Sequence, residues 1–312
     1  MRLLDAMMLV LLLGCGAEPS SSQEDPAPDV VLGGMVKIPG GMVRMGPRHG
    51  VSPPPETIAQ PPVQSRVLAD QQPWVSKAGM GLPPRYYAVS PFWIDVSEVT
   101  KAQYSRFLKE TGYRLPHVAE TWAQDGWNWT GPDPSPGTEE HPVVMLSWYD
   151  AREYCKWAGK RLPTEAQWLL AALGPAEDAR RYPWGSEYDG DRLNHGRREP
   201  PNFDDSDGYE RTSPVGSFPK GRSPYGLVDA FGNAWEYTAD RRVDDWADMA
   251  SSHGKNGVDS DPRTLGPGLR VAVRGGSYYF DLSEPEAEWA AFAPESRRKS
   301  AGLRCARPVP AQ

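Results

Sequence analysis

The chain has 312 residues, of which 39% are apolar, enough to bury a substantial core in one large domain or two average ones. Its 34 basic and 41 acidic residues give a net charge of -7, which argues against nucleic acid or anionic lipid as general partners. The 33 Pro and 31 Gly residues, with few long alternating or heptad runs of Val, Ile and Leu, argue against a sandwich, a parallel sheet or a helical bundle and predict a loop-rich fold.

The first fifteen residues, MRLLDAMMLVLLLGC, have the order of an export signal. Arg2 precedes an apolar run over 6–13 that is too short to span a bilayer as a mature helix. The letters LLGC resemble the bacterial lipobox, in which the cysteine is lipidated, so we predict a lipoprotein signal over 1–15 with lipidation at Cys15. The alternative is an ordinary cleaved signal peptide. Gly16, rather than Asp, after the cysteine favours the outer membrane or the periplasmic face.

The segment that follows, AEPSSSQEDPAPD, consists of Ser, Pro and acidic residues that cannot bury a core. We therefore predict a disordered tether over 16–32, followed by one domain over 33–308. No later segment of the sequence is apolar enough to cross a membrane. The chain is thus expected to be exported and to meet the membrane through its lipid anchor only.

Three helices are predicted from capping-box sequences, TKAQ, SWYD and TEAQ. The first follows the strand-like stretch PFWIDV and runs from Thr100 to a stop at Gly112. The second covers 147–159, and the third begins at Thr164. From about residue 174 onward, turn residues recur without a helical period, so loops with brief strands are expected there.

The cysteines and histidines limit the chemistry available to the chain. If Cys15 is acylated, Cys155 and Cys305 remain in a compartment that tolerates disulfides, and a bridge is favoured over two free buried thiols. A metal site on these cysteines would need histidine partners at ligand spacing, but the histidines are scattered singly at His49, His117, His141, His195 and His253. The sequence also lacks HExxH, CxxC, GxSxG and a phosphate-cradling Gly loop.

Eight segments between residues 33 and 307 resemble, in order, the formylglycine-generating enzyme (sulfatase-modifying factor) family. They are GGMVRMG, PFWIDVSEVTKAQYSRFLKETGY, HPVVMLSWYDAREYCKWAGKRLPTEAQW, RYPWG, TSPVGSFP, YGLVDAFGNAWEYTAD, VRGGSYY and SAGLRCA. The resemblance implies a single α+β domain with the loop-rich, C-type-lectin-related fold of that family, and Cys155 and Cys305 match one of its structural disulfides. It does not by itself imply the family's activity, because one fold hosts many functions.

The resemblance also implies structural calcium at two sites. One would use Asn194, the carbonyl of His195, Asp207 and the carbonyl of Tyr209; the other would use Asn233 and Glu236 with backbone oxygen from Gly232 or Ala234. Calcium takes several oxygen ligands, which irregular turns can supply. The alternative is that these side chains satisfy loop backbone as Asx turns. We expect calcium to stabilise the loops.

The family's oxidase uses two cysteines shortly after RGGS, whose thiolates bind copper(I) and activate O₂ to convert a substrate cysteine to formylglycine. In this chain those positions are Phe280 and Pro285, so no copper is expected. Tyr237 stands in place of the last ring of the family's WEW motif. The resemblance implies a cleft, less reactive and more apolar than the family's, that is lined by Tyr237, Arg274, Ser277, Tyr278, Phe280 and Ser300.

Three functions remain open on this basis. The favoured one is a non-catalytic module that binds a protein, peptide or small molecule in this cleft. The second is a different enzyme on the same fold, which acts on a peptide or a sulfur-containing small molecule. The third is formylglycine generation by an atypical site.

Overall fold

The computed structural model describes residues 31–32, 34–45, 85–124, 126–178, 180–197, 204–242, 270–283 and 289–310. The predicted signal, the lipidated Cys15, most of the tether and Pro285 lie outside these residues. None of the helices within the described ranges is both long enough and apolar enough to span a bilayer.

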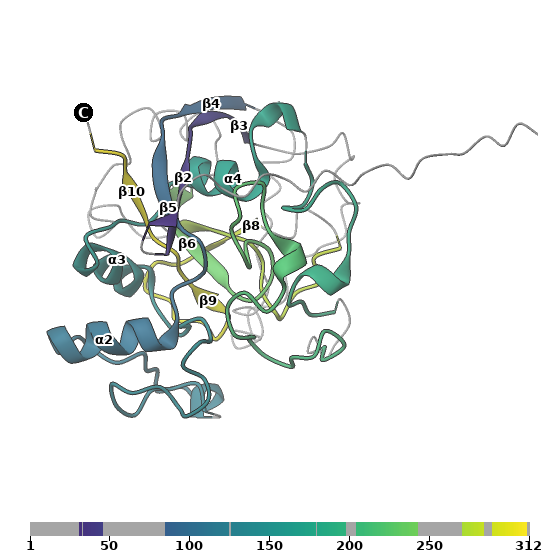
Figure 1. Ribbon diagram of the computed structural model, residues 1–312. Coiled ribbons are helices and arrows are strands. Elements are labelled where there is room, and N and C mark those ends of the chain that lie inside the picture. The colour runs from purple at the N-terminus through teal and green to yellow at the C-terminus, as the bar shows by residue number, and fades with distance from the viewer. Residues whose placement is uncertain are drawn as a thin grey trace, which may run out of the picture.

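Short strands in three sheets form the framework of the described residues (Figure 1). The first sheet joins both ends of the domain with antiparallel neighbours in the order β1 (Val31–Leu32), β2 (Met35–Ile38), β5 (Phe92–Asp95) and β10 (Ala306–Pro308). The second is an antiparallel pair of β3 (Gly41–Met45) and β4 (Arg85–Val89). The third has the order β8 (Trp289–Phe292), β7 (Arg270–Arg274), β6 (Trp235–Arg242) and β9 (Ala301–Gly302), in which only the β6–β9 pair is parallel.

The helices are α2 (Lys101–Thr111), α3 (Trp148–Trp157) and α4 (Glu165–Leu173). All three predicted capping boxes are formed, with Thr100, Ser147 and Thr164 as the N-cap residues. The helix α2 ends at Gly112, whose φ of 65° lies in the left-handed region that glycine adopts without strain. Short 3₁₀ helices cover Thr121–Gln124, Ala176–Asp178, Gly190–Arg192 and Pro219–Gly221. Few helices, short strands and long loops confirm the predicted loop-rich α+β class.

Two hydrophobic clusters hold these elements together. All nine residues of α4 are buried, and this helix packs beside β3 and β4 in the first cluster (Figure 1). Aromatic residues of α2 and α3 meet β6, β7 and β8 in the second cluster. Phe280 packs against both clusters, so the position that the family resemblance linked to chemistry lies at the junction of the two cores.

Candidate functional site

The turn after β7 positions the residues that the sequence singled out. Gly275 and Gly276 have φ values of 96° and 72°, and a Cβ on Gly276 would overlap the side chain of Leu282. The chain then reverses through Ser277, and the amide of Phe280 donates to the Ser277 carbonyl at 3.0 Å. This tight turn directs residue 280 into the protein.

Phe280 is half-buried at this position and packs against the core. Its ring lies 5.5 Å from the ring of Trp235 and 5.8 Å from that of Tyr279, both in edge-on contact. Its carbonyl accepts a hydrogen bond from the Gly196 amide at 2.9 Å, which fixes the backbone as well. Residue 280 therefore contributes apolar packing between two clusters.

The polar atoms of Tyr237 and Arg274 are used inside the protein. The Tyr237 hydroxyl lies 3.1 Å from the carbonyls of both Leu146 and Ser296. Arg274 forms a buried ion pair with Glu165, whose carboxylate also accepts the indole N–H of Trp289 at 3.0 Å. These contacts place the two side chains in the packing of β6 and β7.

The other predicted cleft residues, Ser277, Tyr278 and Ser300, are buried. Ser300 is buried beside Trp235, whose amide donates to the Ser300 carbonyl at 2.8 Å. Ser277 and Tyr278 are fully buried, and the Tyr278 ring stacks on Trp127 with 6.2 Å between the ring centres. Burial raises the pKa of Tyr278, so its hydroxyl stays neutral. The six residues do not form one open polar site.

The first predicted calcium set is brought together. The two carboxylate oxygens of Asp207 accept the backbone N–H groups of His195 at 2.8 Å and Tyr209 at 2.9 Å. Asn194 precedes His195, and its Oδ1 is buried without a hydrogen-bond partner in the described part of the chain. A buried oxygen without a donor is costly, and a cation can satisfy it. These four residues therefore fit an oxygen-rich loop site.

The second predicted set is arranged differently. A Cβ on Gly232 would overlap the Asn194 carbonyl, so glycine allows that carbonyl to accept the Asn233 amide at 3.0 Å. The Asn233 side chain accepts the Ser213 amide at 2.9 Å and donates to Glu98 at 2.6 Å. Protein partners therefore occupy both ends of this amide, which anchors the loop between Gly232 and Ala234.

Glu236 is likewise occupied. Arg304 donates to its two carboxylate oxygens at 2.6 Å and 2.7 Å, and the indole N–H of Trp168 donates at 2.6 Å. All of these groups are fully buried. The bidentate pairing with Arg304 and the indole contact hold the Glu236 carboxylate in place.

Sequence reasoning missed Glu98 and Asp229, which lie near the same cation. We call Glu98, Asp229 and Glu236 the buried acidic group; Arg304 interacts with all three. Burial, together with the charges of Asp229 and Glu236, raises the pKa of Glu98 well above its usual range, and burial raises the pKa of Asp229 to about 6. The three carboxyls share the guanidinium of Arg304 as a counter-charge. Glu98 follows β5, Asp229 lies in a turn and Glu236 lies in β6. Because these segments are far apart in the sequence, no short motif predicts that they are neighbours.

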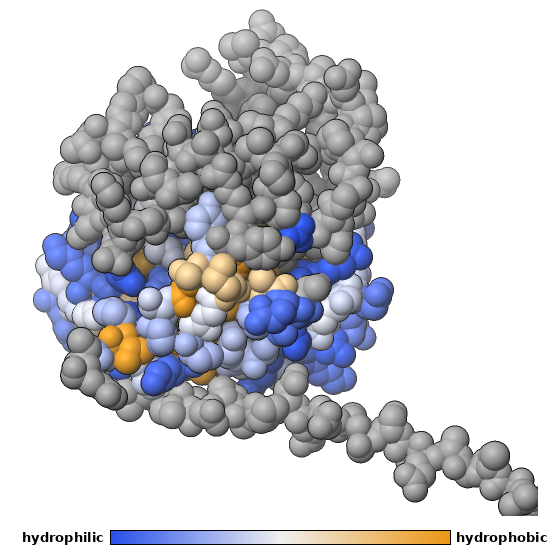
Figure 2. Space-filling model, turned by 90° about the horizontal axis from the view of Figure 1, so that it is seen from above, coloured by the Kyte–Doolittle hydropathy of each residue, from blue (hydrophilic) through white to orange (hydrophobic). Residues whose placement is uncertain are grey.

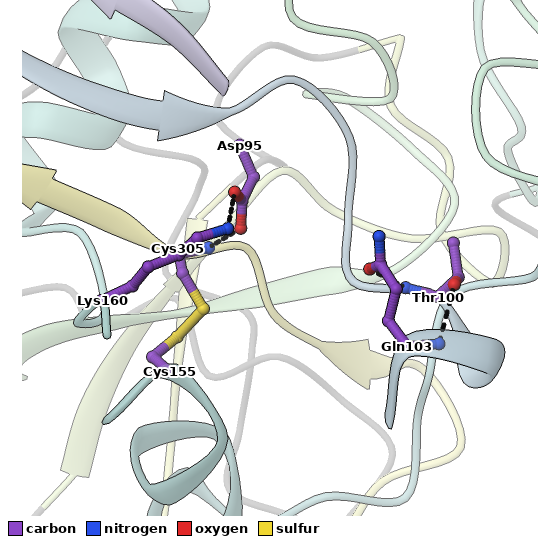
Figure 3. Close-up of a disulfide and its surroundings, with 6 residues drawn as sticks. All are labelled: Asp95, Thr100, Gln103, Cys155, Lys160 and Cys305. Carbon is purple, nitrogen blue, oxygen red and sulfur yellow. Dashed lines mark hydrogen bonds and ion pairs between the residues drawn. A yellow bond between two sulfur atoms is a disulfide. The ribbon is translucent and has the colours of Figure 1, made fainter. Parts of the chain in front are cut away.

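The structure joins Cys155 of α3 and Cys305 in a disulfide, the pair for which the sequence favoured a bridge (Figure 3). Beside it, one oxygen of Asp95 accepts the Cys305 amide at 2.9 Å and the other pairs with Lys160 at 2.5 Å (Figure 3). The bridge therefore ties α3 to the first sheet. In the described residues, no cluster of three or more His, Cys, Asp or Glu side chains has the arrangement of a metal site.

Comparison with known proteins gives a consistent match. Residues 21–309 match the family model described as "Sulfatase-modifying factor enzyme 1-like domain". The "Formylglycine-generating enzyme" of Thermomonospora curvata is 34% identical over 90% of this chain and 95% of its own. The "Inactive C-alpha-formylglycine-generating enzyme 2" of Mus musculus is 29% identical over 97% and 93%. Among solved structures, that of PvdO from Pseudomonas aeruginosa superimposes with a TM-score of 0.60 at 25% identity and covers 88% of this chain and 94% of its own.

Proposed function

Because the chain belongs to the family of sulfatase-modifying factor enzyme 1-like domains, we propose that it uses this fold as a non-catalytic binding module. The observation that carries the proposal is the packing of Phe280 against Trp235 and Tyr279 at the position of a family thiolate. A phenyl ring offers copper(I) no sulfur ligand and forms no mixed disulfide with a substrate. The side chain at this position stabilises the core and carries no redox chemistry.

The thiol content of the chain supports the same proposal. Three cysteines are present, and the disulfide between Cys155 and Cys305 consumes two of them. Only Cys15 remains, so this chain cannot supply two thiolates to one copper(I) ion while the bridge is intact. Copper therefore does not fit the residues present, and no step of the proposed function passes through it.

Overall similarity to the relatives does not distinguish a catalytic from a non-catalytic role. Proteins named as a formylglycine-generating enzyme and as an inactive one both match over nearly the whole chain. Function lives in the site residues rather than in the fold. Since residues 280 and 285 are Phe and Pro, the site residues favour the non-catalytic role.

A copper(I) titration of the full chain tests this proposal. We expect no copper-to-thiolate absorption with the parent chain, and a new band with the double variant Phe280→Cys/Pro285→Cys, because that variant regains two soft ligands. Phe280→Ser/Pro285→Ser is the matched control, since it changes the same two residues to side chains of similar size without adding sulfur. A stoichiometric thiolate band in the parent would contradict the proposal.

We also propose that calcium binds at Asn194, His195, Asp207 and Tyr209, on the strength of the unsatisfied Asn194 Oδ1. When bound, the ion would supply charge that stabilises these loops, with no part in a reaction. We expect a chelator to lower the melting temperature of the parent chain and to have a smaller effect on Asp207→Asn. Asp191→Asn, an exposed change nearby, should respond to the chelator as the parent does. Identical curves with and without chelator, on protein shown to be metal-free afterwards, would refute the site.

The sequence further supports export and lipid attachment at Cys15, and a disulfide is in keeping with an oxidising compartment. We propose an outer-membrane or periplasmic location, with the predicted tether, whose last two residues pair as β1 in the first sheet, between the anchor and the domain. Expression in a Gram-negative host should place the parent in the membrane fraction, whereas Cys15→Ala should release it. Equal release of both chains would contradict lipid anchoring.

A further inference from the structure

A pocket of about 250 Å³ lies between the start of α2 and the loop over 126–136. Trp127 and Trp129 contribute aromatic wall, and Val144 adds an aliphatic side. Lys101, the first residue of α2, contributes an ammonium group to the same pocket. Apolar walls with a few convergent polar groups are the usual composition of a small-molecule site.

The charges of the pocket wall are not balanced. Its carboxylate, Asp133, is already paired with Lys109. The Lys101 ammonium has no ion pair or side-chain hydrogen bond within the residues that the structure describes. Burial and the nearby cation Arg211 lower the pKa of Lys101, while Glu139 acts in the opposite direction. An anion that enters the pocket would compensate the charge of Lys101.

The walls are held in place without a ligand. The side chain of Asn128 exchanges two hydrogen bonds with the backbone of Val118, at 2.9 Å and 2.8 Å. Trp127 stacks on Tyr278, and the guanidinium of Arg211 lies 4.8 Å from the centre of the Trp127 ring. Fixed side chains lose little freedom when a ligand binds, so the pocket is preorganised.

Other surfaces of the described chain make weaker candidates. A larger pocket of about 470 Å³ near the disulfide is lined by Asp95, Lys160, Arg106 and Glu110, but these charges pair with one another. The described residues on the face in Figure 2 are mostly hydrophilic, with apolar residues in small separate groups. The unpaired cation therefore distinguishes the pocket beside Trp127.

We propose that this pocket binds a carboxylate on an apolar or aromatic body, which a free organic acid or the C-terminal residue of a peptide could supply. The ammonium of Lys101 donates to the carboxylate, and Trp127 and Trp129 contact the body. The inference rests on the proposed binding function and assigns it a ligand class. The pocket lies next to Tyr278, but its lining contains none of the six cleft residues that the sequence predicted.

Calorimetric titration of the full chain with two matched pairs of probes tests the proposal. One pair is benzoate and benzamide; the other is N-acetyl-glycyl-phenylalanine as the free acid and as the amide. We expect an acid to bind at least about tenfold more tightly than its neutral partner, because a charged hydrogen bond is lost in the neutral one. A difference within the benzoate pair identifies a free organic acid as the source of the carboxylate. A difference within the peptide pair alone identifies the C-terminal residue of a peptide. Equal binding of acid and neutral probe in both pairs, or no binding by any probe, would overturn the proposal.

Two variants locate the binding. Lys101→Met keeps the length of the side chain and should weaken acid binding at least about tenfold, whereas Lys37→Met makes the same change at an exposed lysine and should have no effect. Unaltered acid binding by a folded Lys101→Met chain would overturn the proposal.

Labelling of amines in the parent chain, followed by mass spectrometry, needs no variant. The acid that binds in the calorimetric titration should protect Lys101 and not Lys37, and an unprotected Lys101 at a saturating concentration of that acid would overturn the proposal. These results are separate from the test of catalysis. If the chain neither binds the acids nor oxidises cysteine, only the ligand assignment to this pocket is wrong. If the chain oxidises a cysteine-containing peptide, the proposed non-catalytic function is wrong.

Discussion

Arg304→Met is expected to lower the free energy of unfolding by about 3 to 5 kcal/mol, because it leaves a buried carboxylate without its ionic partner. Arg304 donates to both oxygens of Glu236 and also to the carbonyls of Asp95, Val96 and Val228. Without the guanidinium, the buried acidic group loses the cation that all three carboxyls share, and three carbonyls lose a donor. For a domain of ordinary stability, this loss is a large fraction of the total.

Urea unfolding followed by circular dichroism measures the effect. The matched control is Arg106→Met, the same substitution in the exposed pair with Glu110, which should leave the unfolding midpoint nearly unchanged. If Arg304→Met does not accumulate as folded protein, Arg304→Lys keeps a cation and should show a smaller loss. A midpoint for Arg304→Met equal to that of Arg106→Met would show that the ion pair does not stabilise the fold.

Removal of the disulfide should have an effect of comparable size. The bridge joins residues separated by 150 positions, and in the chain-entropy model a loop of that length contributes on the order of 3 to 5 kcal/mol. Cys155→Ala/Cys305→Ala should therefore unfold at a lower urea concentration than the parent, and a reductant should lower the parent to a similar midpoint.

Two controls separate the bridge from general effects of cysteine chemistry. Cys15→Ala removes the remaining cysteine and should leave the midpoint unchanged, since that residue takes no part in the bridge. The double alanine variant should not respond to reductant. Two free thiols in the folded parent, detected by a thiol reagent without denaturant, would contradict the bridge itself.

The helices could be predicted from the sequence because their determinants are local. Each N-cap residue, Thr100, Ser147 or Thr164, exchanges hydrogen bonds with the residue three positions further on. All the residues of this interaction therefore lie within four consecutive positions. The contacts of Asp207 with the backbone of His195 and Tyr209 also join residues close together in the sequence.

The roles of Arg274 and Glu236 could not be predicted in the same way. Arg274 pairs with Glu165, 109 positions away, and Glu236 pairs with Arg304, 68 positions away. A polar side chain in a matched motif can face a ligand or an interior partner, and the choice depends on residues far along the chain. The resemblance located these residues near the site, but only the packing shows that their polar atoms are already used.

The pocket beside Trp127 illustrates the same limit. Lys101 starts a helix, Trp127 belongs to a loop, and Arg211 lies in a third segment, so no single stretch of sequence marks them as neighbours. In contrast, the loss of the two family cysteines is visible directly in the letters RGGSYYFDLSEP. Sequence alone therefore indicated which chemistry is missing, and the structure indicated where recognition can occur.

The most direct test of the non-catalytic role is the oxidation of a cysteine-containing peptide. The full chain is incubated with copper(I), oxygen and a peptide that contains Cys-Thr-Pro-Ser-Arg, and the peptide mass is followed over time. The Thermomonospora curvata relative named as a formylglycine-generating enzyme serves as the parallel control. We predict that the relative converts the peptide and that this chain leaves its mass unchanged; conversion of the cysteine to formylglycine by this chain would contradict the central claim.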